Sequence, residues 1–542
     1  MSGEQKIEIK LQPGERIVWI EPGRPLREAF ALAGWRLETP CGGLGTCGKC
    51  RVRISPRLEV TANEREILSA AEIMDGMRLA CQVLVNQPLE VSLPVVTREV
   101  CRKIDVMDER IGELSVAGQG QGYGVALDLG TTTIAGSLVE LHTGRRMALA
   151  AELNPQVIHG ADVLSRLAFA MQGEAERRQL QREAVAAANV IIGRLIKMVG
   201  LDISAIKEGV VVGNTVMHHL MLGLDPVSLS QAPYRPLVSH SVWACAEELG
   251  FNLTPGTNLH FLPNIGGFVG GDAVAVLLAT GLVDSAQVKL ILDIGTNGEI
   301  MLGSTAGLWV CSTAAGPAFE GGRITHGMRA ATGAIEKVRI IDDEVEIAVI
   351  GEGPACGICG SGLIQAVAEL YRVGLVDKTG RLLEVDEVPA EIGVRSRLTV
   401  SEGEREFILV PAEMSAHGRA ISITQQDIRE LQLGKGAIRA GVETLLKELQ
   451  TSEPEIAEVI LTGTFGTYLD IPSTVRIGLI PPRFADRVTL VGNAALLGAE
   501  IALVSSEARV IADQIARKAK RIELANRADF TEFFINYLNF GV

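Results

Sequence analysis

The sequence predicts a small α+β unit followed by a larger α/β unit built from two related lobes. Two observations lead to this expectation. Four of the 9 cysteines fall within the first hundred residues, among short strand-like segments. Further along, an apolar strand that ends in Asp-x-Gly-Thr occurs twice, at Asp128 and again at Asp293. At about 150 residues per domain, a chain of 542 residues has room for three or four folding units.

Composition excludes several classes of protein. With 47% hydrophobic and 21% charged residues, the chain is expected to fold rather than stay disordered. The formal net charge of -14 argues against nucleic acid and anionic membranes as partners. The N-terminus has no apolar core of a signal peptide, and the most apolar stretch, Ala273 to Val283, is too short to span a bilayer. We therefore expect a cytoplasmic protein, whose cysteines call for a metal or redox explanation before disulfides.

The early cysteines form the pattern C-x5-C-x2-C, with a fourth cysteine thirty residues later. The intervening glycines allow tight turns and can direct backbone N–H groups at thiolate sulfurs. Zinc is usually held by two C-x2-C pairs, and only one such pair is present in this group, so a structural zinc site is the weaker alternative. The pattern resembles the adrenodoxin-like branch of [2Fe–2S] ferredoxins. The predicted cluster ligands are Cys41, Cys47, Cys50 and Cys81.

The elements around these cysteines are short. Alternating residues at 6–11 and 16–20 predict a hairpin around Pro13-Gly14, and residues 25–34 read as a helix. Residues 50–54 and 89–93 are strand-like. This order of elements resembles a β-grasp ferredoxin domain, which we expect over residues 1–95.

Residues 96–122 differ in composition from both neighbours. They are rich in charge of both signs and end in a Gly/Gln run, which is typical of a flexible linker. A coil of about 25 residues would reach roughly 25–30 Å, enough for the ferredoxin domain to move relative to the remainder. A docked loop with fixed geometry is the alternative.

Residues 123–542 contain an internal repetition. The first copy is a strand, then Asp128-Leu-Gly-Thr, then the apolar run 134–141. The second copy is the strand from Val288, then Asp293-Ile-Gly-Thr-Asn-Gly-Glu and an apolar run. A later glycine turn, at 463–467, also follows a strand. Between the copies, residues 174–199 predict an amphipathic helix whose apolar face belongs to the core.

These turns suit a nucleoside triphosphate. Gly/Thr turns expose N–H groups and hydroxyls to phosphate oxygens, and an aspartate at a strand end can hold hydrated Mg²⁺. No P-loop motif occurs. We therefore predict ATP and Mg²⁺ as cofactors, with Asp128 and Asp293 as catalytic residues. The predicted nucleotide contacts are Gly130, Thr131, Thr132, Thr133, Gly295, Thr296, Asn297, Gly298, Gly463, Thr464 and Gly466.

The paired motifs resemble the superfamily of actin, hexokinase and the heat-shock chaperone ATPases. The resemblance implies a two-lobed α/β actin-like, ribonuclease H-like ATPase domain over residues 123–542, with ATP between the lobes. It implies that the turn at 463–467 lies on the adenosine side and that the helix start at 491–498 closes the base pocket. A capping box at Thr424 predicts a helix that extends to about Leu449. The resemblance implies that this helix lines the adenosine side.

Four further segments have open interpretations. Asn214 either caps a helix or contacts the nucleotide or a partner, and the adjacent His218 and His219 are poor joint metal ligands. Glu320, in a loop of small residues, is predicted to position water as a catalytic residue; a tight packing loop is the alternative. Cys356 and Cys359 precede a helix at 363–373 and are expected to fill space rather than do redox chemistry. The aromatic segment 530–540 reads as a docked tail.

The whole chain resembles the reductive activators of corrinoid-dependent methyltransferase proteins. The resemblance rests on the four early cysteines, the two Asp-x-Gly-Thr units, the Cys356 to Gly362 segment and the run from Ile421 to Asp427. It implies ATP-dependent transfer of one electron from a [2Fe–2S] cluster to Co(II) of a partner corrinoid protein, giving Co(I). Some relatives carry an extra domain after the ferredoxin, where this chain has only the short linker.

Two other functions stay open. One is an ATP-driven electron-transfer activator of another low-potential enzyme, and the other is a metabolite kinase with a fused ferredoxin module. A kinase needs a positioned catalytic aspartate for its hydroxyl substrate, and no such motif occurs beyond the nucleotide turns. In the preferred reading the partners are a corrinoid protein and a low-potential electron donor. The sequence leaves the oligomeric state open, a homodimer included.

Overall fold

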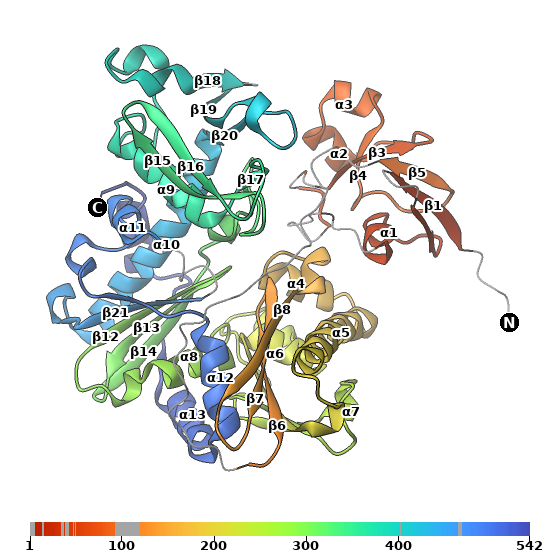
Figure 1. Cartoon of the computed structure of the whole chain (residues 1–542), viewed down its shortest axis with the longest axis vertical. Coiled ribbons are helices and arrows are strands. Elements are labelled where there is room, and N and C mark those ends of the chain that lie inside the picture. The colour runs from red at the N-terminus through yellow and green to blue at the C-terminus, as the bar shows by residue number, and fades with distance from the viewer. Residues whose placement is uncertain are drawn as a thin grey trace. The chain divides into compact units, whose positions relative to one another are not determined.

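A computed structural model describes residues 6–12, 16–33, 37, 43–46, 48, 50–92, 120–401, 403–463 and 469–541. Figure 1 labels the helices and strands. The chain divides into two compact units. One comprises Met1–Arg102 with Asn154–Leu180, and the other comprises Lys103–Leu153 with Gln181–Val542. Most of the predicted linker lies outside the described residues.

The N-terminal residues form a mixed sheet in the order β2-β1-β5-β3-β4. Strand β1 is antiparallel to β2 and parallel to β5, while β3 is antiparallel to β4 and β5. Alternate residues of β1, such as Ile9 and Leu11, are buried because one face of the sheet covers the core. The strands are β1 (Ile7–Gln12), β2 (Arg16–Ile20), β3 (Arg51–Ser55), β4 (Met77–Leu79) and β5 (Leu89–Ser92).

Three short helices accompany this sheet. Phe30 of α1 is fully buried in the same core as Ile9 and Val91 of the sheet. Helices α2 and α3 each begin with a capping box, in which a Ser or Thr side chain and a Glu side chain satisfy backbone N–H groups reciprocally. The helices are α1 (Arg27–Leu32), α2 (Ala62–Ile67) and α3 (Ala70–Met74).

The part of the chain from Tyr123 onward contains two six-stranded sheets, which we call lobe I and lobe II. Lobe I has the order β10-β11-β9-β6-β7-β8, and lobe II the order β22-β21-β12-β13-β14-β23. In each lobe the first three strands form an antiparallel meander, and two later strands are added parallel to the first. This shared order places the repeated Asp-x-Gly-Thr turns at equivalent corners of the two sheets.

The repeated order explains the internal repetition of the sequence. The strands of lobe I are β6 (Tyr123–Leu129), β7 (Thr133–Glu140), β8 (Arg146–Leu153), β9 (Ile206–Gly213), β10 (Val242–Cys245) and β11 (Asn258–Phe261). The strands of lobe II are β12 (Lys289–Ile294), β13 (Gly298–Ser304), β14 (Gly307–Thr313), β21 (Glu458–Thr462), β22 (Val488–Leu490) and β23 (Lys520–Arg521).

Helices α8 (Gly271–Thr280) and α12 (Ala494–Val504) lie side by side between the two sheets (Figure 1). Both share one core with strands of lobe I and lobe II. They approach closely because Gly498 has no side chain, and a Cβ there would lie 2.0 Å from the backbone oxygen of Ala275. The neighbouring helix is α13 (Ser506–Lys518).

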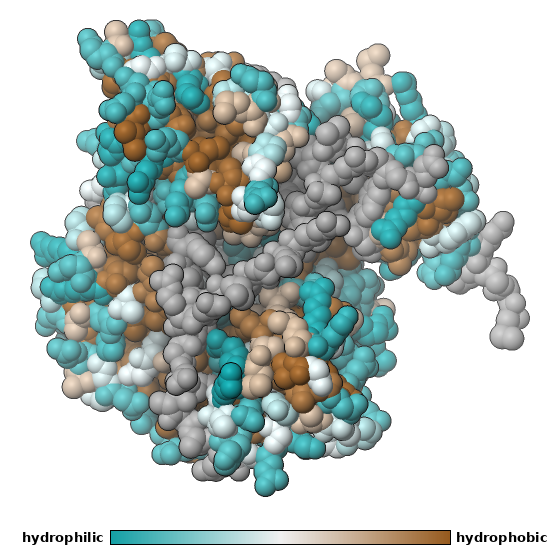
Figure 2. Space-filling model, viewed as in Figure 1, coloured by the Kyte–Doolittle hydropathy of each residue, from teal (hydrophilic) through white to brown (hydrophobic). Residues whose placement is uncertain are grey.

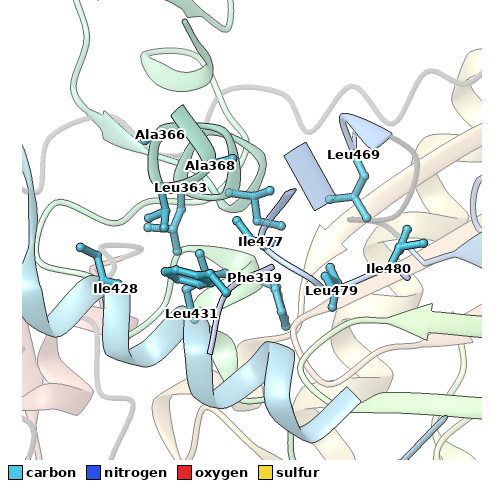
Figure 3. Packing of buried hydrophobic residues seen from close by; sticks show 14 of the residues in the cluster. Phe319, Leu363, Ala366, Ala368, Ile428, Leu431, Leu469, Ile477, Leu479 and Ile480 are labelled. Atoms are coloured by element: carbon cyan, nitrogen blue, oxygen red, sulfur yellow. The ribbon is translucent and has the colours of Figure 1, made fainter. Parts of the chain in front are cut away.

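Two three-stranded sheets and two long helices complete lobe II. Phe319 packs between Leu363 of α9 and Leu431 of α10 in the core drawn in Figure 3. The helices are α9 (Gly360–Arg372) and α10 (Gln425–Leu449). The strands are β15 (Ala334–Ile341), β16 (Glu344–Val349), β17 (Gly357–Ile358), β18 (Leu398–Ser401), β19 (Glu404–Val410) and β20 (Ile421–Thr424).

The C-terminal segment docks along α10, as the aromatic composition predicts. Phe540 is buried, and the buried ammonium group of Lys435 donates a hydrogen bond to the carbonyl oxygen of Asn539. Lys447 of α10 forms an ion pair with Asp529. The remaining helices are α4 (Val163–Ala170), α5 (Glu174–Val199), α6 (Thr215–Met221), α7 (Ala246–Leu249), α11 (Ile471–Arg476) and α14 (Ala528–Asn536).

Apolar residues on the surface are interspersed with polar ones. On the face drawn in Figure 2, hydrophilic residues interrupt the hydrophobic groups of both units. Among the residues that the structure describes, no helix is both long enough and apolar enough to cross a membrane.

Candidate functional site

Two of the predicted cluster ligands meet in the described structure. Cys50 directly precedes β3 and Cys81 follows β4, and these antiparallel strands pair Arg51 with Leu79. The next residues along continue this pairing, since the N–H of Ala80 donates to the backbone oxygen of Cys50, and Ala80 directly precedes Cys81. The Sγ atoms of Cys50 and Cys81 are 3.3 Å apart, and both residues are buried. A pair of convergent buried thiols is the donor chemistry that an iron–sulfur cluster requires.

The loop before Cys50 is held against the segment that contains Cys81. Gln82 donates hydrogen bonds from Nε2 to the backbone oxygen of Gly43 at 2.7 Å and to the sulfur of Cys81 at 3.7 Å. Gly45 has a φ of +76°, and a Cβ there would lie 2.7 Å from the Gln82 side chain. Glycine is therefore needed at this position for both backbone and space. The predicted ligands Cys41 and Cys47 lie outside the described residues.

The two phosphate-loop candidates meet between lobes I and II. Thr132 follows β6 and Thr296 follows β12, and their hydroxyl oxygens are 3.0 Å apart. Both hydroxyls also lie within hydrogen-bond distance of Glu320: Thr132 at 2.7 Å and Thr296 at 3.0 Å from Oε2. The structure thus brings together three residues that the sequence assigned to one site. A phosphate group that reached these hydroxyls would have to replace the carboxylate of Glu320.

Glu320 is positioned by the residue before it. Phe319 is fully buried among side chains of α9 and α10 (Figure 3), so the short helical turn Pro317–Glu320 is anchored to the core of lobe II. The fit requires glycine at position 434, because a Cβ there would lie 2.8 Å from the Phe319 ring. The loop therefore packs tightly at Phe319, as the alternative interpretation expects. Its next residue, Glu320, contacts the two threonines.

Four acidic residues influence one another beside these loops. Burial raises the pKa of Asp128 to about 6. Burial and then the charge of Asp128 raise the pKa of Asp293 to about 7. Asp272, in the first turn of α8, has its pKa raised by burial and by Asp128. Burial, followed by the charges of Asp272 and Asp293, raises the pKa of Glu299, which pairs with Asp293 across β12 and β13.

The cluster of oxygens fits Mg²⁺ bound together with phosphates. Within the described part of the chain, no group of three or more His, Cys, Asp or Glu side chains is arranged to hold a metal ion by itself. Mg²⁺ usually keeps several waters and takes one or two carboxylates plus phosphate oxygens, so it does not need a complete protein cage. Mutual repulsion of buried carboxylates is relieved when a cation enters.

The remaining predicted loop residues shape the turns. A Cβ at Gly130 would lie 2.3 Å from the backbone oxygen of Thr133, the first residue of β7. The N–H of Gly295 donates to the carbonyl oxygen of Asn297 at 2.9 Å, and a Cβ at Gly298 would lie 2.8 Å from Oγ1 of Thr313. These close approaches keep both turns compact around Thr132 and Thr296.

The third turn begins next to the second aspartate. Gly463 has a φ of +95°, and a Cβ there would lie 2.6 Å from Oδ1 of Asp293. Thr464 and Gly466 lie outside the described residues. Asn214 caps a helix, one of the two roles that the sequence left open, and also contacts a predicted phosphate-loop residue. Its Oδ1 accepts a hydrogen bond from Met217 N at 3.0 Å as the cap of α6, and its Nδ2 donates to Thr131 Oγ1 at 3.1 Å.

Other candidates do not join this site. Cys359 is buried and its thiol donates to the backbone oxygen of Ile335, as expected for a residue that fills space, whereas Cys356 is exposed. His219 is bound on both nitrogens, to the backbone of Thr215 and of Leu237.

Sequence reasoning missed Asp272 and Asn493. Asn493 caps α12, and its Nδ2 donates to Oδ2 of Asp128 at 2.8 Å. The role of the 491–498 segment in the base pocket stays a prediction. A Gly-Gly-Asp sequence at 270–272, at the start of an apolar helix, is the signal that could have indicated Asp272.

Comparisons with known proteins find matches in the N-terminal unit and in both lobes. Residues 9–86 match the 2Fe-2S iron-sulfur cluster binding domain, 123–285 the RACo middle region and 287–541 the C-terminal domain of RACo, the ASKHA domain. The chain is 32% identical to the corrinoid activation enzyme RamQ of Eubacterium limosum, over 95% of this chain and 96% of that protein. The chain belongs to the family of reductive activators of corrinoid proteins.

Two further relatives agree with this family. A solved structure of a reductive activator for a corrinoid, iron-sulfur protein is 31% identical, with a TM-score of 0.71 over 99% of this chain and 98% of that chain. The [Co(II) methylated amine-specific corrinoid protein] reductase of Methanosarcina barkeri is 26% identical over 77% of each chain. The predicted fold class is confirmed: in this activator a ferredoxin domain is followed by an actin-like ATPase domain.

The raised pKa of Asp293 predicts a pH dependence of stability. A carboxyl group whose pKa rises on folding, here from 3.8 to about 7, stabilises the protein fully below its ordinary pKa. That contribution is lost as the pH rises through about 7. Lys435 acts in the opposite direction, because burial lowers its pKa to about 7. The informative quantity is therefore the difference in Tm between the unliganded wild type and Asp293→Asn.

We expect the Tm of Asp293→Asn minus the Tm of the wild type to become larger as the pH is raised from about 5 to about 8. Above about pH 8 this difference should stay constant. The subtraction removes the contribution of Lys435, which both proteins share. Calorimetry across this range, without nucleotide or Mg²⁺, measures it. If the difference in Tm between the two proteins does not change with pH, folding does not raise the pKa of Asp293.

Proposed function

We propose that this chain is an ATP-dependent reductive activator that passes one electron from a [2Fe–2S] cluster to Co(II) of a partner corrinoid protein. The electron reduces Co(II) to Co(I), and a low-potential electron donor then reduces the cluster again. Hydrolysis of Mg²⁺-ATP drives the transfer. The proposal is carried by the combination, in one chain, of a ferredoxin domain and an ASKHA domain that together align with a corrinoid activation enzyme over 95% of this chain.

The energetics favour coupling of the two domains. Moving one electron uphill by about 100 mV costs roughly 2.3 kcal/mol, since about 59 mV is a tenfold change for one electron. A nucleotide that binds two protein states with different affinity can supply this free energy by shifting their equilibrium. Thr132 and Thr296, one from each lobe, offer hydroxyls to the same place, which supports a nucleotide-dependent change between the lobes.

In this proposal the residues of the chain have separate tasks. Cys50 and Cys81, with the two cysteines of the preceding loop, would hold the cluster, which supplies a one-electron carrier when bound. Asp128 and Asp293 would bind Mg²⁺ through oxygen atoms beside the phosphates. The terminal phosphate would displace the carboxylate of Glu320 from the hydroxyls of Thr132 and Thr296. Glu320 would then lie close enough to the phosphate to position the attacking water.

The test is ATP-dependent reduction of Co(II) in a corrinoid protein encoded beside this chain. The full protein, with its cluster reduced by a chemical low-potential donor, is mixed with the corrinoid protein, and the loss of the Co(II) EPR signal is followed. We expect loss of the signal with Mg²⁺-ATP and not with ADP. A non-hydrolysable ATP analogue distinguishes binding from hydrolysis. Reduction at the same rate without nucleotide, or ATP turnover stimulated only by sugars, would overturn the proposal.

A further inference from the structure

Asn493 uses both ends of its amide. Its Oδ1 accepts a hydrogen bond from the N–H of Leu496 at 2.8 Å, which caps α12, and its Nδ2 donates to Oδ2 of Asp128 at 2.8 Å. A backbone N–H can only donate and a carboxylate can only accept, so the orientation of the amide is determined by its partners. Asparagine is the residue that satisfies both: an ionised aspartate could cap the helix but could not donate to Asp128.

The turn that carries Asn493 is held by the central sheet of lobe II. Thr462, the last residue of β21, donates from Oγ1 to the backbone oxygen of Gly492 at 2.8 Å and accepts from the N–H of Ala494 at 3.1 Å. Thr462 is also the register partner of Asp293 on β12. One chain of contacts therefore runs from the strand of the second aspartate, through this turn, to the first aspartate in lobe I.

Helix α12 cannot shift easily along its axis. Glu500 is fully buried and forms a bidentate ion pair with Arg146 of β8, in lobe I. Gly498 lies directly against the backbone of α8 at Ala275, and α8 begins at Gly271 with Asp272 in its first turn. The packing of α8 and α12 thus determines where both Asn493 and Asp272 stand relative to Asp128.

From these contacts we infer that Asn493 is a positioning residue of the nucleotide site: its amide sets the carboxylate of Asp128 for Mg²⁺ and links it to lobe II. The inference rests on the proposed function only in assuming Mg²⁺-dependent nucleotide binding. Asp128 would be the group that touches the metal, and Asn493 acts through it.

The decisive variant is Asn493→Ser. Serine is a good N-cap, so the start of α12 is retained, but its shorter side chain does not reach Asp128 with a donor. Ser505→Ala is the matched control. It removes the side-chain cap of the neighbouring helix α13, where Ser505 accepts from Ala508 N.

The full protein is titrated with Mg²⁺ at fixed ATP, and nucleotide binding is measured by calorimetry with and without Mg²⁺. We expect Asn493→Ser to need about tenfold more Mg²⁺ for half-saturation, the usual effect of losing a partner behind a metal ligand. Metal-free binding of ADP to Asn493→Ser should stay unchanged. Ser505→Ala should lower the Tm without changing the Mg²⁺ requirement. If Asn493 had a purely structural role, Asn493→Ser would likewise lower the Tm without changing the Mg²⁺ requirement.

The possible failures are distinguishable because no corrinoid protein enters the assay. An unchanged Mg²⁺ requirement in folded Asn493→Ser would overturn the role of Asn493 and leave the proposed function intact. A wild-type protein whose nucleotide binding does not respond to Mg²⁺ would overturn both. Equal loss of metal-free and Mg²⁺-dependent binding in Asn493→Ser would also contradict the inference, because it would mean that the variant damages the nucleotide pocket as a whole.

Discussion

Replacing Asp293 with asparagine should lower Mg²⁺-dependent ATP turnover by about 100-fold or more, the effect expected when one preorganised charged group is lost from a catalytic site. Asp293 is the penultimate residue of β12, pairs with Glu299 across the hairpin and lies against the turn at Gly463. Asparagine keeps the size and the turn but cannot supply the negative charge.

The folded protein retains this carboxylate at a cost. Burial and the neighbouring Asp128 raise the pKa of Asp293 to about 7, so its charge is unfavourable in the unliganded protein. Groups with such shifts are concentrated at functional sites. Asp293→Asn should therefore be more stable than wild type at pH 8 and yet inactive, whereas a structural aspartate would show loss of stability instead.

Steady-state phosphate release, together with the Mg²⁺ concentration for half-maximal rate, measures this effect. Asp342→Asn is a matched control, because Asp342 is an exposed turn residue of the same lobe. A rate for Asp293→Asn within a few-fold of wild type, in a protein of normal Tm, would remove Asp293 from the site.

Replacing Cys81 with alanine should abolish electron transfer while ATP binding persists. Cys81 and Cys50 present their sulfurs 3.3 Å apart in a buried setting, so loss of either removes one of the predicted cluster ligands. Acid-labile sulfide and iron should fall from two per chain to near zero, with loss of the matching visible and EPR spectra. Stoichiometric zinc in the wild type would contradict the cluster assignment.

ATP binding by Cys81→Ala should remain near the wild-type value, because the nucleotide residues belong to lobes I and II. Calorimetric titration with Mg²⁺-ATP measures it. Cys245→Ala is the matched control, since Cys245 lies in β10 of lobe I and should change neither the cluster nor the nucleotide affinity. Simultaneous loss of cluster and ATP binding in Cys81→Ala would mean that the two domains do not function separately.

Local pattern was sufficient for much of the fold. The helix predicted at 174–199 has those bounds in the structure, because its apolar face repeats at helical spacing along its length. The Thr424–Asp427 capping box begins α10 as expected, since a capping box is a contact between residues three apart. The repeated Asp-x-Gly-Thr units indicated two equivalent lobes, and five strands of each sheet follow the same order. The sixth strand differs, because β10 is added beside β11 in lobe I and β23 beside β14 in lobe II.

Parts of the candidate site could not be found in this way. Asn493 reaches Asp128 across 365 positions of sequence, and no local pattern records such a contact. Asp272 stands in the first turn of an apolar helix, where an acidic residue is ordinary, and only the crossing of α8 and α12 brings it to the other carboxylates. Glu320 was named from its loop alone, and its contact with two threonines of different lobes is a tertiary result.

The sequence by itself determined the donor types and their local spacing: cysteines on a glycine-rich loop, and aspartate with glycine and threonine at two strand ends. These residue types and spacings involve neighbours within a few positions, so they can be recognised from the sequence alone. Only the tertiary structure decided which of them share one electrostatic environment. Burial raises the pKa of Asp128, and burial and the charge of Asp128 raise that of Asp293, because two sheets and two closely packed helices hold both carboxylates out of water.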